Sequence, residues 1–148
     1  QYKEQDSPRG LPDAFILGEQ FINNQNVAMI LGDNFFYGQS LSSMLHTCIK
    51  LNKGAKIILH KVLDPQKFGV AKIKKKKILS IKEKPKRFFS FLTIKGLYFF
   101  DKKVVKYYKK LKKKKFYLLK KNLKNFFLIL QLLDFIFLIK MLLNILKN

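Results

Sequence analysis

Glycine and proline are confined to the first two thirds of this 148-residue chain, and this limits where the chain can turn. All seven glycines lie at or before Gly96, and all four prolines lie at or before Pro85. Tight turns depend on these two residue types, together with Asn and Asp. After residue 101, 42 of 47 residues are Lys, Asn, Ile, Phe, Leu or Tyr. We therefore expect one turn-rich domain in residues 1–110 and a low-complexity tail, helical or disordered, in residues 111–148.

The net charge of +22 follows the same division. Residues 1–70 hold seven Lys or Arg against six Asp or Glu, whereas residues 102–148 hold fourteen against one. Such a charge is typical of proteins that bind nucleic acid or anionic membranes. Because the charge rises toward the C-terminus, it does not characterise the N-terminal domain. The common tail residues all have codons made only of A and T, so one hypothesis for the tail is a reading-frame slip in AT-rich coding DNA.

Apolar spacing predicts helices and strands over the first part of the chain. The predicted helices lie at 13–22, 41–51 and 102–111, and the predicted strands lie at 26–31, 55–63, 69–73, 78–85 and 91–101. Strands 69–73 and 78–85 flank four lysines and predict a hairpin. The continuous apolar run 26–31 predicts a strand covered on both faces. The pattern as a whole predicts an α/β fold with a partly parallel sheet.

The cysteine and the two histidines do not indicate a disulfide, a metal site or a nucleophile. The single cysteine, Cys48, excludes an internal disulfide and a zinc site built from cysteines. Its place in the predicted helix 41–51 indicates a buried structural thiol rather than a nucleophile. His46 and His60 share no metal-ligand spacing with each other or with an acid.

One short motif, AMILGDNFFYGQ at residues 28–39, places a carboxylate at the end of an apolar strand. In open α/β sheets, ligands bind beyond the carboxyl ends of the strands. Asp33 could hold a divalent metal there, and Gly32 leaves room for a phosphate or a sugar near the backbone. Asp33 and Asn34 could equally cap the turn after the strand. The motif alone leaves both interpretations open.

The tail contains an apolar run, residues 126–146, that is long enough to span a bilayer. Asp134 and Lys140 interrupt the run, and each costs roughly 2.5–3.5 kcal/mol near the centre of a membrane helix, so a span is not expected. The tail leaves one alternative function open, that of a non-enzymatic basic protein that binds an anionic membrane or nucleic acid. The tail has no arginine. It also has no recognisable nucleic-acid motif, which favours a charge run without a binding role.

Five segments resemble the sugar-phosphate nucleotidylyltransferase family, in order and with natural spacing. They are YKEQDSPRGLPDAFILGEQFI, LGDNFFYG, DPQKFGV, KEKP and IKGLYFFD. The resemblance covers residues 2–110, and QDSPRGLPDAF favours the thymidylyl-transferring branch. It implies a nucleotide-diphospho-sugar transferase fold, with a Rossmann-like mixed sheet and flanking helices, incomplete here. It further implies a homo-oligomer in a bacterial cytoplasm, with no nucleic-acid or membrane partner, that makes dTDP-glucose and pyrophosphate from dTTP and glucose-1-phosphate with Mg²⁺.

The resemblance also implies roles for seven residues. They are Asp33 for the metal and catalysis, Lys84 for the sugar phosphate and catalysis, Gln5 and Gly10 for thymine, and Gly69, Glu83 and Tyr98 for the sugar. Apart from Tyr98, these residues are expected to share one cleft with the Asp33 carboxylate.

The chain also departs from the family. The family's glycine-rich loop around the triphosphate and its second metal-binding aspartate have no counterpart, and the chain begins in mid-pattern at Gln1. Lys95 stands where the family has a small hydroxyl residue, and Lys82 stands where it has an acid. We therefore expect an internal fragment that is inactive alone.

Overall fold

The chain is described by a computed structural model that covers residues 1–7, 9–75 and 77–121. Its elements, in chain order, are η1 (Leu11–Asp13), α1 (Ala14–Leu17), α2 (Glu19–Ile22), β1 (Val27–Ile30), α3 (Leu41–Ile49), β2 (Ala55–Lys61), η2 (Pro65–Lys67), β3 (Gly69–Lys74), β4 (Lys77–Glu83), β5 (Leu92–Phe100) and α4 (Val104–Lys121). Each predicted strand and helix is present. The predicted helix 13–22 is divided at Gly18, whose φ of −88° and ψ of 7° depart from helical values.

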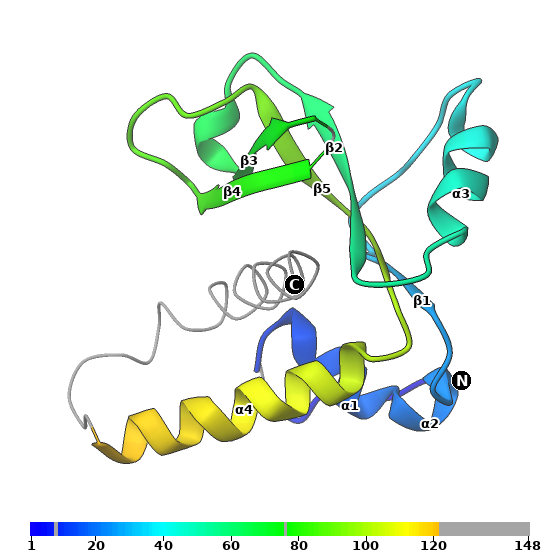
Figure 1. Cartoon of the computed structure of the whole chain (residues 1–148), viewed down its shortest axis with the longest axis vertical. Coiled ribbons are helices and arrows are strands. Elements are labelled where there is room, and N and C mark those ends of the chain that lie inside the picture. The colour runs from blue at the N-terminus through cyan, green and yellow to red at the C-terminus, as the bar shows by residue number, and fades with distance from the viewer. Residues whose placement is uncertain (8, 76, 122–148) are drawn as a thin grey trace.

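β5 is the central strand of the five-stranded sheet (Figure 1). β2 pairs with both halves of β5, so β1 and β3 lie along the opposite edge of β5, and β4 continues the sheet beyond β3. All of these pairings are antiparallel. The sequence predicted a partly parallel sheet, but no parallel pair occurs among the described strands. β1 and β2 run in the same direction, yet β5 lies between them.

β1 is less covered than the sequence predicted. Val27 and Met29 are half-buried and pack against the main core, whereas Ala28 and Ile30 are exposed. Successive side chains of a strand point to opposite faces, so one face of β1 meets the core and the other does not. The prediction of cover on both faces was therefore wrong for β1, and Ile30 is 58% exposed.

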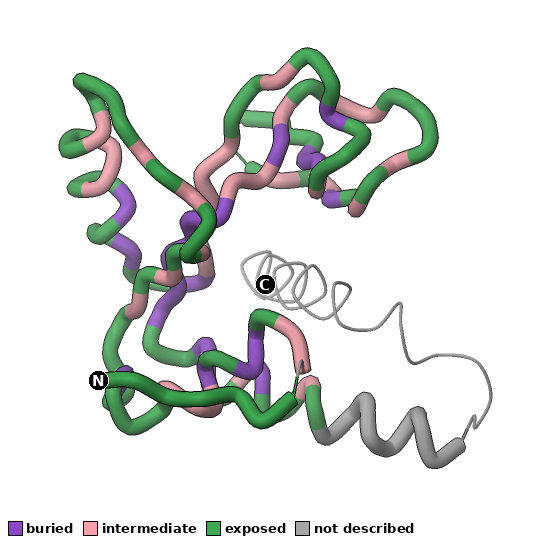
Figure 2. Tube along the Cα trace, turned by 180° about the vertical axis from the view of Figure 1, so that it is seen from behind, coloured by how far each residue is buried: buried purple, intermediate pink, exposed green. Residues whose placement is uncertain are grey.

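β5, in contrast, buries both faces. Phe100 packs on one face against α1 and α4, with the ring of Phe15 edge-on at 5.1 Å between ring centroids. Leu97 and Phe99 point to the other face and pack against Cys48 of α3. Cys48 is buried, as predicted, and its burial raises the pKa of the thiol. Buried residues therefore concentrate where the helices meet β5 (Figure 2).

α4 closes the lower end of the molecule and lies beside α1 (Figure 1). It buries Val104, Val105 and Tyr108 in the core, and this spacing places them on one face of a helix. The buried Asp101 precedes α4, and its carboxylate accepts hydrogen bonds from the backbone N–H groups of Gly54 (2.6 Å) and Lys103 (2.8 Å). These bonds anchor the start of α4 to the loop before β2.

α4 runs without a break through residue 110, where the sequence predicted a domain boundary. The division into 1–110 and 111–148 stays a prediction. The apolar run 126–146 lies outside the described residues. Within the described part of the chain, no helix is both long enough and apolar enough to cross a bilayer.

Candidate functional site

Asp33 lies in a tight turn just beyond the carboxyl end of β1, as the sequence predicted. The turn is closed by a hydrogen bond from the Asn34 N–H to the Leu31 carbonyl (3.1 Å). The Leu31 N–H donates to the Gly96 carbonyl (2.8 Å), which ties the turn to β5. The Asn34 amide nitrogen donates to Asp33 Oδ1 (2.6 Å). The turn therefore holds an exposed carboxylate at a fixed place beside the central strand.

Gly69 and Glu83 form a register pair of the β3–β4 hairpin. A Cβ atom on Gly69 would lie only 2.9 Å from Glu83 Oε2, so the glycine makes the space that the carboxylate occupies. Burial raises the pKa of Glu83, and the neighbouring charge of Lys84 opposes this rise. Lys84 has a φ of 38°, and its N–H donates to the Phe68 carbonyl (3.0 Å). Such a φ is uncommon for a residue with a side chain and fixes how the chain leaves β4.

Tyr98 lies close enough to both Asp33 and Glu83 of the hairpin to interact with their charges. It is buried in the centre of β5, opposite Met29 of β1 and Ile57 of β2. Burial, then the negative charges of Glu83 and Asp33, raise the pKa of Tyr98 to about 12. Both carboxylates are therefore close enough to act on one phenol. We call Asp33, Gly69, Glu83, Lys84 and Tyr98 the Tyr98 group.

Gln5 and Gly10 belong to a second group, around the buried Asp13. The Asp13 carboxylate accepts from Arg9 Nε (2.8 Å), Lys112 Nζ (3.2 Å) and Gln5 Nε2 (3.3 Å). The Asp13 N–H also donates to the Gly10 carbonyl (3.2 Å). We call Gln5, Arg9, Gly10, Asp13 and Lys112 the Asp13 group.

The predicted site residues thus lie in two sets of contacts, the Tyr98 group and the Asp13 group, and the cleft that they were expected to share stays a prediction. No ion pair between described residues joins one group to the other. They are linked instead by aromatic rings: Phe15 contacts Phe100, and Phe100 stacks on Tyr98 at 6.3 Å between centroids. Phe15 follows Asp13 by two positions, so this row of rings runs from the Asp13 group to the Tyr98 group.

The sequence analysis did not identify Gly96, which lies beside the Asp33 turn, or the contacts of Asp13 with Arg9 and Lys112. Gly96 packs its backbone against the Asp33 turn, and a Cβ atom there would lie 2.8 Å from Leu31 Cβ and 2.5 Å from the Asn34 amide nitrogen. An isolated glycine inside a strand pattern often marks a close backbone approach, and this signal was available. Asp13 was interpreted only as a first-turn residue. Its partner Lys112 is 99 positions away, so no local pattern indicates the contact.

The Asp13 group predicts how stability depends on pH. Burial alone would raise the pKa of Asp13, but the hydrogen bonds from its three partners outweigh burial and hold the pKa below the ordinary value of 3.8. The stabilisation from ionised Asp13 is therefore complete above its unfolded pKa and is lost as the pH falls through the folded value. We expect the unfolding free energy of the wild type to fall more steeply below about pH 4 than that of Asp13→Asn, as measured by urea denaturation at several pH values.

Asp6→Asn is the matched control for this prediction, because it makes the same chemical change at an exposed neighbour whose contact with Arg9 is long, at 3.8 Å. It should retain the steep wild-type dependence. Equal slopes for wild type and Asp13→Asn would show that the Asp13 contacts contribute little.

The oxygen ligands of the Tyr98 group suit Mg²⁺ only in part. No cluster of three His, Cys, Asp or Glu side chains that could hold a metal occurs within residues 1–7, 9–75 and 77–121. Mg²⁺ is commonly bound by one or two carboxylates, with substrate phosphates and water completing its octahedron. The exposed carboxylate of Asp33 at a strand end fits such a partial site.

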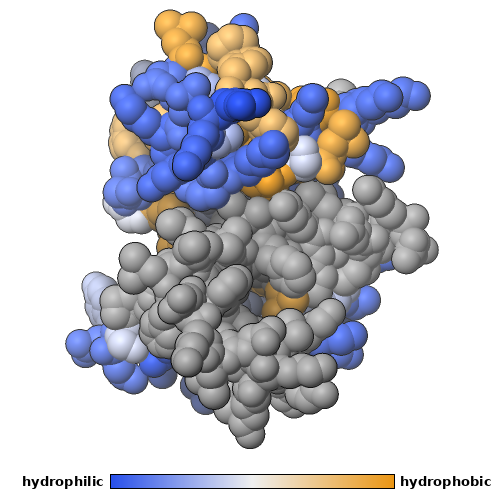
Figure 3. All heavy atoms as spheres, turned by 90° about the vertical axis from the view of Figure 1, so that its left-hand side faces the viewer, coloured by the Kyte–Doolittle hydropathy of each residue, from blue (hydrophilic) through white to orange (hydrophobic). Residues whose placement is uncertain are grey.

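The two lysines that depart from the family pattern contact aromatic rings. Lys82 Nζ lies 4.6 Å from the ring centroid of Phe89, and Lys95 Nζ lies 4.3 Å from that of Phe68. Both are cation–π contacts. At this end of the molecule, hydrophilic and hydrophobic side chains are interleaved on the surface (Figure 3), and Phe88 is 61% exposed. Lys82 of β4 and Lys95 of β5 thus pack against aromatic rings on the surface of the sheet.

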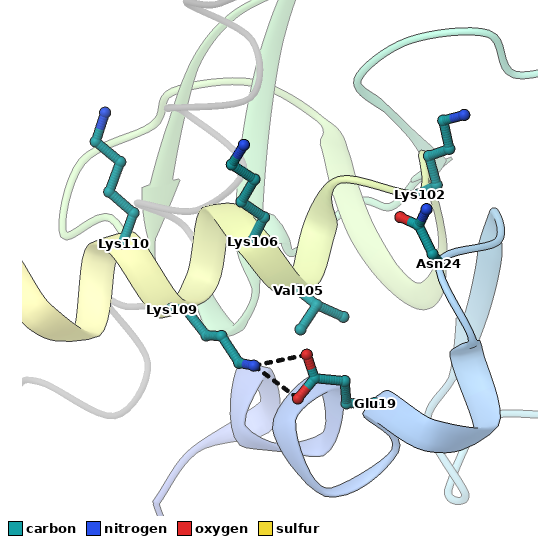
Figure 4. A pocket seen from close by; sticks show the side chains of 7 residues that line it. All are labelled: Glu19, Asn24, Lys102, Val105, Lys106, Lys109 and Lys110. Atoms are coloured by element: carbon teal, nitrogen blue, oxygen red, sulfur yellow. Dashed lines mark hydrogen bonds and ion pairs between the residues drawn. The ribbon is translucent and has the colours of Figure 1, made fainter.

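A cavity of about 500 Å³ lies between α2 and α4. It is lined by Glu19, Asn24, Lys102, Val105, Lys106, Lys109 and Lys110. Lys109 Nζ contacts both carboxylate oxygens of Glu19, at 2.6 and 2.7 Å (Figure 4). None of the seven predicted site residues lines this cavity. The ion pair fastens α4 to α2.

Comparison with known proteins places the chain in a family. The model of the nucleotidyl transferase family matches residues 1–127. Two glucose-1-phosphate thymidylyltransferases, from Neisseria meningitidis and Neisseria gonorrhoeae, are 44% and 46% identical over 112 and 113 residues. These matches cover 75% and 76% of this chain. The chain spans 39% of the length of either relative.

Solved structures show the same fold. A Bacillus anthracis protein described as a glucose-1-phosphate thymidylyltransferase, in complex with sucrose, matches with a TM-score of 0.66 and 39% identity. The match covers 75% of this chain and 45% of that one. A UDP-glucose pyrophosphorylase complexed with UDP-glucose matches at 23% identity with a TM-score of 0.61, which supports the fold alone. The predicted sugar-nucleotidyltransferase fold is thus confirmed, and the chain belongs to the nucleotidyl transferase family.

Proposed function

We propose that this chain is part of a glucose-1-phosphate thymidylyltransferase and that its Tyr98 group binds the sugar phosphate. The names and identities of the Neisseria relatives support the reaction. The observation that carries the site is the register pair of Gly69 and Glu83, in which a half-buried carboxylate stands against a backbone that has no side chain. A carboxylate accepts hydrogen bonds from sugar hydroxyls, and the glycine lets the sugar approach the strand.

The remaining members of the Tyr98 group fit the other parts of the same substrate. Lys84 follows Glu83 and carries a compact positive charge that suits the phosphate. Tyr98 is a neutral phenol at neutral pH, since its pKa lies at about 12, and a neutral phenol can donate a hydrogen bond. Asp33 would hold Mg²⁺, which, when bound, neutralises charge on the α-phosphate of the nucleotide.

We propose that Gln5 and Gly10 bind the thymine of dTTP. The side-chain amide of Gln5 offers both a donor and an acceptor, as reading a base edge requires. The homo-oligomer and the cytoplasmic location implied by the resemblance stay predictions.

Binding of glucose-1-phosphate to the 148-residue chain tests this proposal. We expect Glu83→Gln to weaken binding about ten- to hundredfold in isothermal titration calorimetry, because hydrogen bonds to a charged acceptor contribute roughly 1.5–3 kcal/mol. Glu19→Gln is the matched control, since it makes the same change at the ion pair with Lys109. Equal affinities for wild type and Glu83→Gln would remove Glu83 from the sugar site.

We expect a polypeptide limited to these 148 residues to transfer no nucleotidyl group from dTTP to glucose-1-phosphate. The chain spans 39% of the length of its relatives, and positioning of both substrates supplies most of the catalysis in phosphoryl transfer. Release of pyrophosphate is the measurement, and Asp33→Ala is the background control. Turnover clearly above that control would contradict the prediction.

A further inference from the structure

The carboxylate of Asp13 holds side chains from two separate parts of the chain. Its side chain is 2% exposed and forms ion pairs with Arg9 from the N-terminal segment and with Lys112 from α4. The third partner is Gln5, whose Nε2 lies 3.3 Å from Asp13 Oδ2. A buried carboxylate surrounded by two cations and an amide is a rigid hydrogen-bond acceptor.

The Asp13 carboxylate determines the orientation of the Gln5 side-chain amide. A glutamine side chain carries an NH₂ group that donates and a carbonyl oxygen that accepts, whereas an ionised carboxylate only accepts. The pKa of Asp13 is lowered by its partners, so the group is ionised at neutral pH. Gln5 must therefore turn Nε2 toward Asp13, and its Oε1 points away from Asp13.

We infer that Asp13 is a positioning residue that makes Gln5 present a hydrogen-bond acceptor to the base of a bound nucleotide. The inference rests on the proposed function, because it takes Gln5 as the residue that reads the base. An outward Oε1 accepts a hydrogen bond from the imide N3–H of thymine or uracil. The same oxygen repels the N3 lone pair of cytosine. Asp13 thus selects for thymine or uracil against cytosine without touching the base.

Asp13→Asn tests the inference, because an asparagine both donates and accepts and no longer fixes the Gln5 amide. We expect the ratio of the dCTP to the dTTP dissociation constant, measured by calorimetry on the 148-residue chain, to fall about tenfold, the effect of one hydrogen bond. Gln5→Leu removes the reading group itself and should lower the ratio to the same level.

Lys112→Gln is the matched control. It removes one partner of Asp13 but leaves the carboxylate as an acceptor for Gln5, so the nucleotide ratio should stay at the wild-type value even if stability falls. A purely structural role for Asp13 predicts that Lys112→Gln and Asp13→Asn lower the ratio equally, and that result would overturn the inference.

An NMR measurement on the wild type needs neither a folded variant nor a nucleotide. We expect one side-chain amide proton of Gln5 to resonate further downfield than the side-chain amide protons of the exposed Gln20 and Gln25. The same Gln5 proton should also exchange with solvent more slowly than they do. Signals of Gln5 that match these references would overturn the inference. If neither nucleotide binds, the proposed function fails and the inference with it. If both bind and Asp13→Asn keeps the wild-type ratio, only the inference fails.

Discussion

Gly96→Ala is expected to destabilise the fold by about 3 kcal/mol, at the upper end of the cost of overpacking a core. The new Cβ atom would lie 2.8 Å from Leu31 Cβ and Leu31 Cγ and 2.5 Å from the Asn34 amide nitrogen. Leu31 Cβ is next to the backbone, so the turn has to move away from β5. This shift would strain the hydrogen bond from the Leu31 N–H to the Gly96 carbonyl, and Asp33 would move with the turn. Urea denaturation measures the loss.

Gly32→Ala is the control, because it adds the same methyl group within the same turn. Apart from Gly32 itself and its two chain neighbours, no residue has a heavy atom within 4 Å of a Cβ atom placed on Gly32. We expect its stability to stay within about 0.5 kcal/mol of wild type, as for most surface changes. Equal effects of the two substitutions would mean that Gly96 is not the contact that holds the turn.

Gly69→Ala is expected to weaken the binding of glucose-1-phosphate while changing the stability of the fold only slightly. The new Cβ atom would lie 2.9 Å from Glu83 Oε2, and the next contact, with Ile94 Cδ1 at 3.6 Å, is an ordinary one. Because the end of the Glu83 side chain can rotate away, stability should change by less than about 1 kcal/mol. The carboxylate then leaves the place where it would meet the sugar. Affinity for glucose-1-phosphate should fall about a hundredfold, measured by calorimetry beside urea denaturation.

Combining Gly69→Ala with Glu83→Gln gives a sharper comparison. If the glycine acts by placing the carboxylate, the double variant should bind little worse than Gly69→Ala alone, because neighbouring residues that act together are not additive. Additive losses would instead mean that Gly69 contributes by backbone approach to the sugar, independently of Glu83.

Local patterns in the sequence predicted the elements of the fold well. Each expected strand and helix is found, and the hairpin of β3 and β4 flanks the expected lysines, because short-range spacing of apolar residues reports which side chains a strand or helix can bury. The resemblance to a family proposed seven site residues, and the structure links five of them in the Tyr98 group, through the Gly69–Glu83 pair and the charges that act on Tyr98. Their roles remain predictions, since contacts alone do not show what a site binds.

The sequence by itself thus determined where the strands, helices and candidate residues lie along the chain. Only the tertiary structure decided that β5 is central and that its described neighbours all pair antiparallel with it, because strand order depends on contacts between distant segments. It also decided that β1 leaves one face exposed, since cover depends on which elements pack there. The contact of Asp13 with Lys112, 99 positions away, likewise arises only when the N-terminal segment folds against α4. A spacing rule cannot foresee such contacts, because chain folding, not sequence separation, brings the charges together.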